Sequence, residues 1–262
     1  MPSYAVTGTS RGLGLGFVKT LSADPRNTVF AIVRSVTSAG ELQKFVEDSI
    51  HKNTHIIEAD NNDIQGIKAW LTLFIGFTVS DGASLMAYER ASLTIDAFPS
   101  EETLEEDLLH YFKTNTLGPI HTINAFVPLL RKGDLKKCIV ISTTAGSPRV
   151  AAETSFAHFV GYGISKAGVN LATAKYAARF KDEGIIFLAV TPGMVKTMPG
   201  TEEEVNKVLE PIAQKLRARY PHFEGPITVE QSVNDVLALI DRVTISESGS
   251  FVHRDGRDGD SV

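Results

Sequence analysis

A glycine-rich turn directly after an apolar run constrains the fold of this chain more than any other feature. The turn reads Thr7-Gly8-Thr9-Ser10-Arg11-Gly12-Leu13-Gly14. The run Ser3–Thr7 before it predicts a strand, and Leu13–Leu21 after it predicts a helix. Glycines at this spacing let the backbone approach a pyrophosphate, which the N–H groups at the start of the helix also favour. The pattern predicts a dinucleotide site, and the alternative is an ordinary turn between a strand and a helix.

Strand-like and helical stretches alternate along the rest of the chain. We expect further strands at Thr28–Val33, His55–Glu58, Cys138–Ser142 and Ile185–Val190, and helices at Gly40–Ser49, Leu104–Leu130 and Ala167–Phe180. Near-continuous apolar strands between helices predict a parallel sheet that is covered on both faces. Residues 64–84 should hold one more helix and a fourth strand.

The chain is predicted to form one domain over residues 1–253. Within it, residues 194–226 form a long insertion with a helical stretch at Glu202–Arg219, which is typical of a lid over a pocket. Residues 254–262 are rich in Asp, Gly and Arg, and this composition predicts a flexible, solvated tail.

Composition excludes several classes of protein. The 262 residues are 43% hydrophobic, which is enough for one sizeable core. A net charge of −5 without a long basic run argues against a nucleic-acid partner. The single cysteine, Cys138, and the scattered histidines predict neither disulfides nor a metal site. The most apolar stretch, Trp70 to Val79, is too short to span a bilayer, so we expect a soluble, cytoplasmic protein with no membrane partner.

The end of the second predicted strand indicates which dinucleotide would bind. A site for NAD places a carboxylate there to bind the ribose 2′-hydroxyl. This chain has Ile32-Val33-Arg34-Ser35, with no acid. Arg34 and Arg11 can instead form charge-assisted hydrogen bonds with a 2′-phosphate, which predicts NADP(H). Either arginine alone would be equally typical of a solvated surface residue.

Tyr162 and Lys166 are four residues apart in Tyr162-Gly163-Ile164-Ser165-Lys166, which places them on one face of a helix. A tyrosine that exchanges protons near neutral pH needs a pKa below its usual value of about 10. An ammonium at about 5 Å contributes roughly 3 kcal/mol at an effective dielectric near 20, which lowers that pKa by about two. On its own, a Tyr-x-x-x-Lys pair is common and usually lies on the protein surface. It indicates a catalytic pair only in a chain that also has the glycine turn and, one strand and loop before the pair, Ser142-Thr143.

With these motifs in place, nearly the whole chain resembles the short-chain dehydrogenase/reductase family. The further landmarks are Asp60, Asn115 in Lys113-Thr114-Asn115-Thr116-Leu117-Gly118, Ser142-Thr143, and Pro192-Gly193-x-x-x-Thr197. The gap between Ser142-Thr143 and Tyr162 is longer than usual, as in the branch of fungal norsolorinic acid ketoreductases and sniffer-type carbonyl reductases. The resemblance implies a doubly wound Rossmann-type α/β domain with a central parallel sheet of about seven strands.

The resemblance also implies roles for single residues. Tyr162 would be the general acid/base, Lys166 would lower its pKa and hold the nicotinamide ribose, and Asn115 would anchor a water in a proton relay. Thr143 or Ser142 would polarise the substrate carbonyl. The implied cofactor-binding residues are Gly8, Ser10, Arg11, Gly12, Leu13, Gly14, Arg34, Asp60, Asn115, Tyr162, Lys166, Pro192, Gly193, Val195 and Thr197. Among these, Asp60 would hydrogen-bond the adenine and Thr197 the nicotinamide carboxamide.

The implied activity is NADPH-dependent reduction of a ketone or aldehyde, a small-molecule carbonyl substrate, to its alcohol. Family members commonly form homodimers or homotetramers through the helices at 104–130 and 162–180. The apolar residues expected at the pocket favour a bulky or aromatic substrate, although core or lid packing explains them equally well; they are Phe156, Phe159, Met194, Val195, Met198 and Phe223.

One departure from the family pattern leaves two alternatives open. The family's Asn-Asn-Ala-Gly segment is absent, and the nearest candidate is Asp81-Gly82-Ala83-Ser84. Together with Thr143 in place of the usual serine, this is compatible with an NADP(H)-binding sensor or scaffold with little redox catalysis. The third hypothesis is a non-redox isomerase or dehydratase that uses the same tyrosine.

Overall fold

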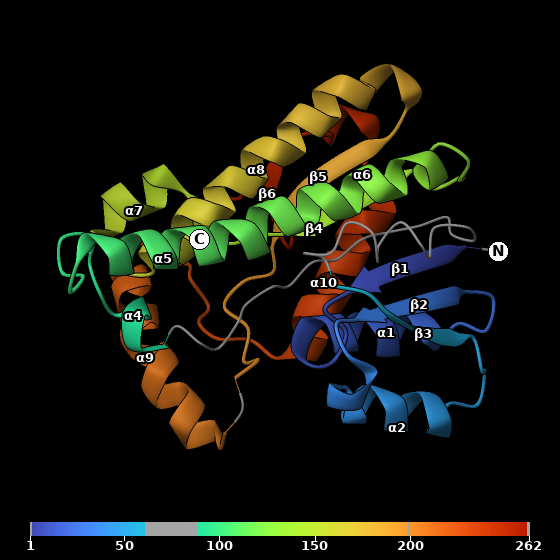
Figure 1. Cartoon of the computed structure of the whole chain (residues 1–262), viewed down its shortest axis with the longest axis horizontal. Helices are drawn as coiled ribbons and strands as arrows, with labels where there is room; N and C mark the ends of the chain where they lie inside the picture. The colour runs from blue at the N-terminus through green and yellow to red at the C-terminus, as the bar shows by residue number, and fades with distance from the viewer. Residues whose placement is uncertain (1, 61–87, 199, 261–262) are drawn as a thin grey trace.

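The computed structural model describes residues 2–60, 88–198 and 200–260, and within them six strands form two parallel three-stranded sheets (Figure 1). The first sheet has the order β1 (Ser3–Thr7), β2 (Thr28–Val33), β3 (Thr54–Glu58). The second has the order β4 (Lys137–Ile141), β5 (Ile186–Thr191), β6 (Phe251–His253). The predicted parallel α/β architecture is confirmed, while the expected fourth strand at 64–84 lies outside the described residues.

Helices cover both faces of the sheets (Figure 1). On one face, α1 (Gly12–Ser22) and α10 (Val229–Arg242) pack with residues of both sheets in one buried apolar group, which α2 (Gly40–Asp48) borders. On the other face, α6 (Gly118–Leu130) and α8 (Val160–Phe180) pack on β4 and β5, and α6 also covers β1 and β2. All six residues of β5 are buried, which explains its unbroken apolar sequence.

The predicted bounds agree closely with the observed strands and differ at two helices. The long helical stretch at Leu104–Leu130 is divided into α5 (Glu101–Phe112), a π-helical turn at Lys113–Leu117, and α6. Helix α8 begins at Val160, before the expected start at Ala167, and it includes the Tyr162–Lys166 pair, which the spacing placed on one face of a helix.

The predicted lid contains helix α9 (Glu202–Arg219), with the bounds expected from sequence. A capping box between Thr201 and Glu204 starts this helix. Its far end lies on α7 (Pro148–Thr154), where Glu153 accepts a hydrogen bond from the Tyr220 hydroxyl at 2.8 Å and pairs with Arg219 at 3.0 Å. The short helix α4 (Tyr88–Ala91) precedes α5.

The prediction of a flexible tail at 254–262 is wrong for residues 254–260. The chain turns back after β6, so the His253 N–H donates to the Arg257 carbonyl and the Gly259 N–H to the Phe251 carbonyl, both at 2.9 Å. Gly256, at φ 88°, permits this turn. The Asp and Arg residues that suggested a solvated tail are instead used in ion pairs.

No helix among the described residues is both long and apolar enough to cross a membrane.

Candidate functional site

The carboxyl ends of the parallel strands bring several of the predicted site residues to one edge of the molecule. Gly8 follows β1, Arg34 follows β2, and Asp60 lies two residues beyond β3. Ser142 follows β4, and Pro192 follows β5. In open parallel α/β sheets this edge is where ligands bind.

The glycine turn presents the N-terminus of α1 at this edge. Gly8 and Gly12 have φ values of 71° and 59°, a region that side chains rarely adopt. A Cβ atom on Gly14 would overlap the Gly8 carbonyl, so the helix can pack against the turn only with glycine there. The first turn of α1 has no acidic residue and no side-chain cap, which leaves its N–H groups to an external anion. This arrangement fits a pyrophosphate.

Two arginines flank this turn. Arg11 and Arg34 are exposed, and within the described part of the chain neither takes part in an ion pair. The nearby carboxylate of Glu58 is engaged, since it accepts the Val36 N–H at 2.7 Å. Arg34 at the end of β2 and Arg11 directly before α1 therefore offer two cations for a phosphate.

Tyr162 and Lys166 lie together on the first turns of α8. The Lys166 ammonium is 5.7 Å from the centre of the Tyr162 ring. Lys166 is only 2% exposed, and its Nζ donates to the carbonyl oxygen of Ile141 at 2.9 Å. This bond ties the helix to the last residue of β4, directly before Ser142.

The π-helical turn brings Asn115 against the same helix. Asn115 is buried, and its Nδ2 donates to the Ser165 hydroxyl at 3.1 Å. Ser165 in turn donates to the Tyr162 carbonyl at 2.7 Å, and Thr116 donates to the Ser165 carbonyl at 2.7 Å. π-turns often mark functional positions in helices. Sequence reasoning missed Ser165, whose only signal is a small polar residue three positions after Tyr162.

Ser142 and Thr143 differ in environment. Ser142 is 2% exposed, and its hydroxyl has no hydrogen-bond partner among the described residues. Thr143 is half-buried, and its hydroxyl oxygen accepts the Ala145 N–H at 3.2 Å at the start of a 3-10 turn, Thr144–Gly146. A Cβ on Gly146 would lie 2.8 Å from the Ala167 nitrogen, so this turn packs closely on α8.

A buried acid stands at the N-terminus of α8. The helix begins after Phe159, which has φ 58° and provides no side-chain cap. Asp107 of α5 is buried there beside Gly161. Burial raises the pKa of Asp107, and this effect exceeds the lowering by the charges of Arg90 and His110 and by the Gly161 N–H. Burial and Asp107 also raise the pKa of Tyr111 to about 12. No motif pointed to Asp107, because its role depends on a contact between two helices.

Aromatic rings surround Tyr162. The Tyr111 ring lies edge-on at 6.0 Å between centroids, and the Phe159 ring lies at 6.4 Å. Phe156 stacks on Phe159 at 5.7 Å. Of the remaining residues considered for the pocket, Val195 packs against the core beneath α10, which favours core packing for that residue.

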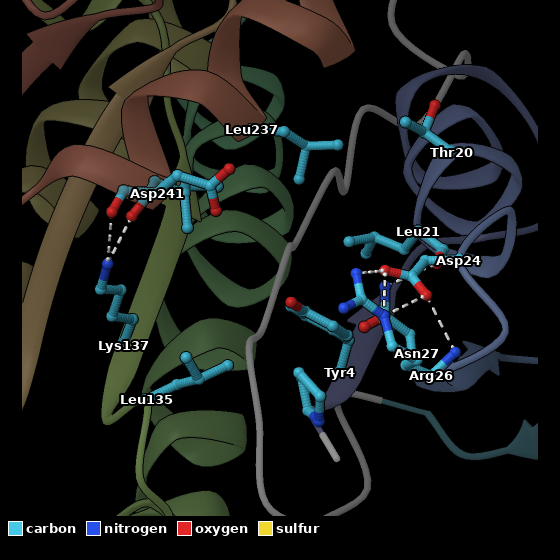
Figure 2. A pocket seen from close by; sticks show the side chains of 12 residues that line it. Tyr4, Thr20, Leu21, Asp24, Arg26, Asn27, Leu135, Lys137, Leu237 and Asp241 are labelled. Carbon is cyan, nitrogen blue, oxygen red and sulfur yellow. Dashed lines mark hydrogen bonds and ion pairs between the residues drawn. The ribbon is translucent and has the colours of Figure 1, made fainter.

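A cavity of about 350 Å³ lies at the opposite edge of the sheets (Figure 2). Pro2 and Tyr4 of the first sheet and Lys137 at the start of β4 line it, so it lies by the amino ends of the strands. The Lys137 ammonium donates to the carbonyls of Ile240 and Asp241 at the end of α10. None of the predicted site residues lines this cavity.

No three His, Cys, Asp or Glu side chains of the described ranges are grouped so that they could hold a metal ion.

This chain is similar to one protein family and to several known proteins. Residues 3–208 match the family described as short chain dehydrogenase. The short-chain dehydrogenase/reductase atnB of Arthrinium sp. is 36% identical over 98% of each chain, and AacuF of Aspergillus aculeatus is 37% identical over 96% of this chain and 97% of its own. Among solved structures, the NADPH-bound carbonyl reductase from chicken fatty liver is 28% identical with a TM-score of 0.76, covering 98% of both chains. The carbonyl reductase Sniffer of D. melanogaster is 25% identical with a TM-score of 0.77, covering 98% of both chains.

Proposed function

This chain belongs to the short chain dehydrogenase family and is an oxidoreductase of that family, and from this we propose that it reduces a ketone or aldehyde to an alcohol with NADPH. The observation that carries the proposal is the pairing of Tyr162 with the buried ammonium of Lys166, which is bonded to the end of β4. A phenol beside an ammonium has the properties of a general acid at neutral pH.

Two features of the described residues and one similar structure support NADPH as the cofactor. The uncapped start of α1 suits the pyrophosphate, and the glycines leave room for its close approach. Arg11 and Arg34 suit a 2′-phosphate, to which an acid at the end of β2 would be repulsive. The chicken carbonyl reductase, which has a similar fold, is described with NADPH bound.

The chain's own residues supply the proton and the binding energy. When bound, NADPH supplies the hydride to the carbonyl carbon. Tyr162 donates its hydroxyl proton to the carbonyl oxygen as negative charge develops on that oxygen. The Lys166 ammonium stabilises the tyrosinate that remains, and proton transfer from solvent restores the phenol. Asn115 holds the turn of α8 that carries Tyr162, through Ser165.

The test is an assay of NADPH oxidation, followed by its absorbance, with a panel of aromatic and aliphatic ketones and aldehydes. We expect turnover with NADPH and much weaker turnover with NADH. Consumption of a substrate in the absence of any nicotinamide would favour an isomerase or dehydratase. Tight NADPH binding with no turnover across the panel would favour a sensor or scaffold.

We propose Thr143 as the residue that polarises the substrate carbonyl. Its hydroxyl oxygen accepts the Ala145 N–H, so its own proton can be donated, and the residue is open to solvent where Ser142 is closed off. Thr143→Val, which keeps the shape, should lower kcat by about 100-fold, as loss of one such donor does in other enzymes. Ser142→Ala should change kcat less than threefold. The reverse order of the two steady-state effects would assign the role to Ser142.

We propose that two copies of the chain associate through α5 and α8. Leu109 and Phe112 of α5 and Ile164 and Leu171 of α8 are all exposed apolar residues. A Cβ on Gly168 of α8 would lie 3.5 Å from the Phe112 ring, so Phe112 of α5 packs beside α8 at Gly168. The double variant Leu109→Glu, Leu171→Glu should halve the mass measured by light scattering, because charges at such a contact are not solvated. A wild-type mass equal to one chain contradicts the proposal.

A further inference from the structure

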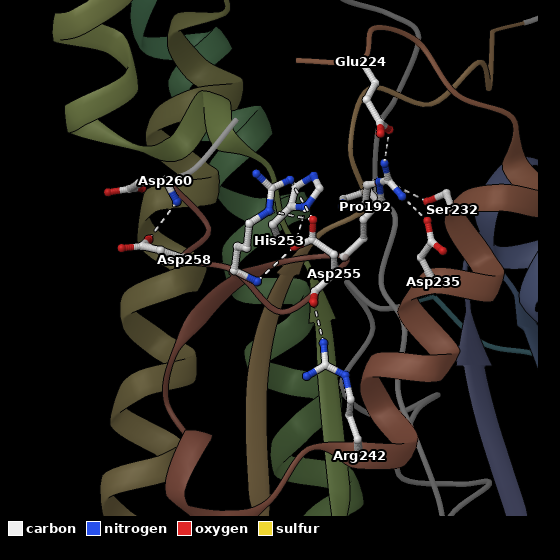
Figure 3. A network of polar contacts seen from close by, with 11 residues as sticks. Pro192, Glu224, Ser232, Asp235, Arg242, His253, Asp255, Asp258 and Asp260 are labelled. Atoms are coloured by element: carbon white, nitrogen blue, oxygen red, sulfur yellow. Dashed lines mark hydrogen bonds and ion pairs between the residues drawn. The ribbon is translucent and has the colours of Figure 1, made fainter. Parts of the chain in front are cut away.

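Arg254 lies directly after β6 and pairs with Asp235 of α10 and with Glu224 near the end of the lid segment, which is residues 194–226. Figure 3 shows these two carboxylates, Asp235 and Glu224. Its side chain is only 12% exposed. One guanidinium nitrogen pairs with Asp235 of α10, and another pairs with Glu224 at 2.9 Å. Asp235 belongs to α10, which packs against the sheets. Glu224 lies two residues before the end of the lid segment.

The same guanidinium touches the point where the lid segment begins. A Cβ on Gly193 would lie 3.3 Å from Arg254 Nε, and Gly193 has φ 84°. Directly before it, the Pro192 carbonyl accepts the hydroxyl of Ser232 from α10 at 2.7 Å. Arg254 therefore lies against Gly193, directly before the lid segment, and pairs with Glu224 near the end of the segment and with Asp235 of α10.

The two ends of the lid segment are also joined to each other. The Ile227 N–H donates to the Met194 carbonyl at 2.8 Å, and the Lys196 N–H donates to the Ile227 carbonyl at 3.0 Å. These residues form an isolated parallel β-bridge, and we call Met194–Lys196 and Ile227 the neck of the lid. Arg254 lies beside this neck rather than on the lid's outer surface.

The segment that carries Arg254 is itself held in place. The Asp255 carbonyl accepts from the Arg242 guanidinium of α10, and the Asp255 carboxylate accepts from Arg257 at 2.7 Å. The imidazole Nδ1 of His253 lies 3.0 Å from that carboxylate. Arg254 thus projects from a fixed turn, so forming both pairs orders its side chain without ordering additional backbone.

We propose that Arg254 is a positioning residue that fixes the neck of the lid against α10. In doing so it holds the segment with Gly193, Val195 and Thr197, which the family resemblance assigns to the cofactor, so the inference rests on the proposed function in this respect. Exposed ion pairs contribute little, but this arginine is nearly buried, and removing it leaves the partly buried Asp235 without its partner. The ion pair with Glu224, whose side chain is 68% exposed, then determines how tightly the C-terminal end of the lid segment is held against Arg254.

Limited proteolysis tests the positioning role of Arg254 without measuring NADPH oxidation. The lid segment offers trypsin five sites, Lys196, Lys207, Lys215, Arg217 and Arg219. Arg254→Met should speed cleavage at these sites by about fivefold or more, as mass spectrometry of the fragments can show. Glu224→Gln should act in the same direction but less strongly. The double variant should be cleaved no faster than Arg254→Met, because both act through one contact.

Arg131→Met is the matched control, because it removes the ion pair with Glu183 at 2.6 Å, far from the lid. It should leave cleavage of the lid unchanged. If Arg254→Met does not fold, Glu224→Gln carries the test, since its exposed side chain is tolerant of change. Cleavage at the wild-type rate in the folded variants would overturn the proposal.

Kinetics separate this inference from the proposed function. Arg254→Met should raise the KM for NADPH about five- to tenfold with less than a twofold change in kcat, because a loosened binding loop affects binding first. An enzyme that never oxidises NADPH overturns the proposed function but leaves the proteolysis result decisive. If the wild type oxidises NADPH and Arg254→Met does not change cleavage of the lid segment, only the positioning role of Arg254 is overturned.

Discussion

Tyr162→Phe is expected to lower kcat for carbonyl reduction by about a thousandfold while NADPH binds as before. The substitution removes only the hydroxyl group, so the ring can keep its contacts with Tyr111 at 6.0 Å and with Phe159 at 6.4 Å. A positioned general acid contributes about 10² to 10⁴ in rate. Steady-state kinetics with a saturating ketone, together with the quenching of protein fluorescence by NADPH, measure the two quantities.

Tyr111→Phe provides the matched control. Tyr111 is a buried neighbour on α5, and burial raises its pKa to about 12. A group with this pKa stays protonated through the neutral range and does not release a proton to the substrate. Its loss should change kcat by less than about threefold. A Tyr162→Phe enzyme that keeps more than a tenth of its wild-type kcat would refute the assignment of Tyr162 as the acid.

Local sequence patterns predict the frame of the site. The glycine turn and the alternation of apolar strands depend on neighbours in the chain, so β1 and β2 have their predicted bounds. The Tyr162–Lys166 pair follows from helical spacing alone. The absent Asn-Asn-Ala-Gly pattern could be noted from sequence, but its counterpart at residues 81–84 lies outside the described residues.

Features that depend on contacts between distant segments could not be predicted in this way. The π-turn at Lys113–Leu117 has no signal in the spacing of apolar residues, which continues on both sides as in one helix. Asp107 looks like one acid among several in the first half of α5, and only the approach of α8 brings the Gly161 N–H to it. Arg254 has the composition of a solvated tail, although its guanidinium is nearly buried. In each case a tertiary contact overrides the local pattern.

Arg34→Asp is expected to raise the KM for NADPH by about 100-fold and to shift the preference of the enzyme toward NADH. Arg34 follows β2, is exposed, and has no ion-pair partner within the ranges that the structure describes. Loss of a hydrogen bond to a charged group costs about 1.5–3 kcal/mol, and the new carboxylate also repels the 2′-phosphate. The same carboxylate can accept a hydrogen bond from the 2′-hydroxyl of NADH.

The effect should appear in KM and not in kcat at saturation, because Arg34 touches neither the reacting carbonyl nor Tyr162. Raising the salt concentration should weaken NADPH binding to the wild type more than to Arg34→Asp, since an exposed ion pair is screened. Arg26→Gln, which removes an exposed arginine paired with Asp24 near the cavity of Figure 2, is the control and should leave both KM values unchanged. Equal KM values for NADPH in the wild type and in Arg34→Asp would place the 2′-phosphate elsewhere, and Arg11→Gln would then be the variant expected to lose it.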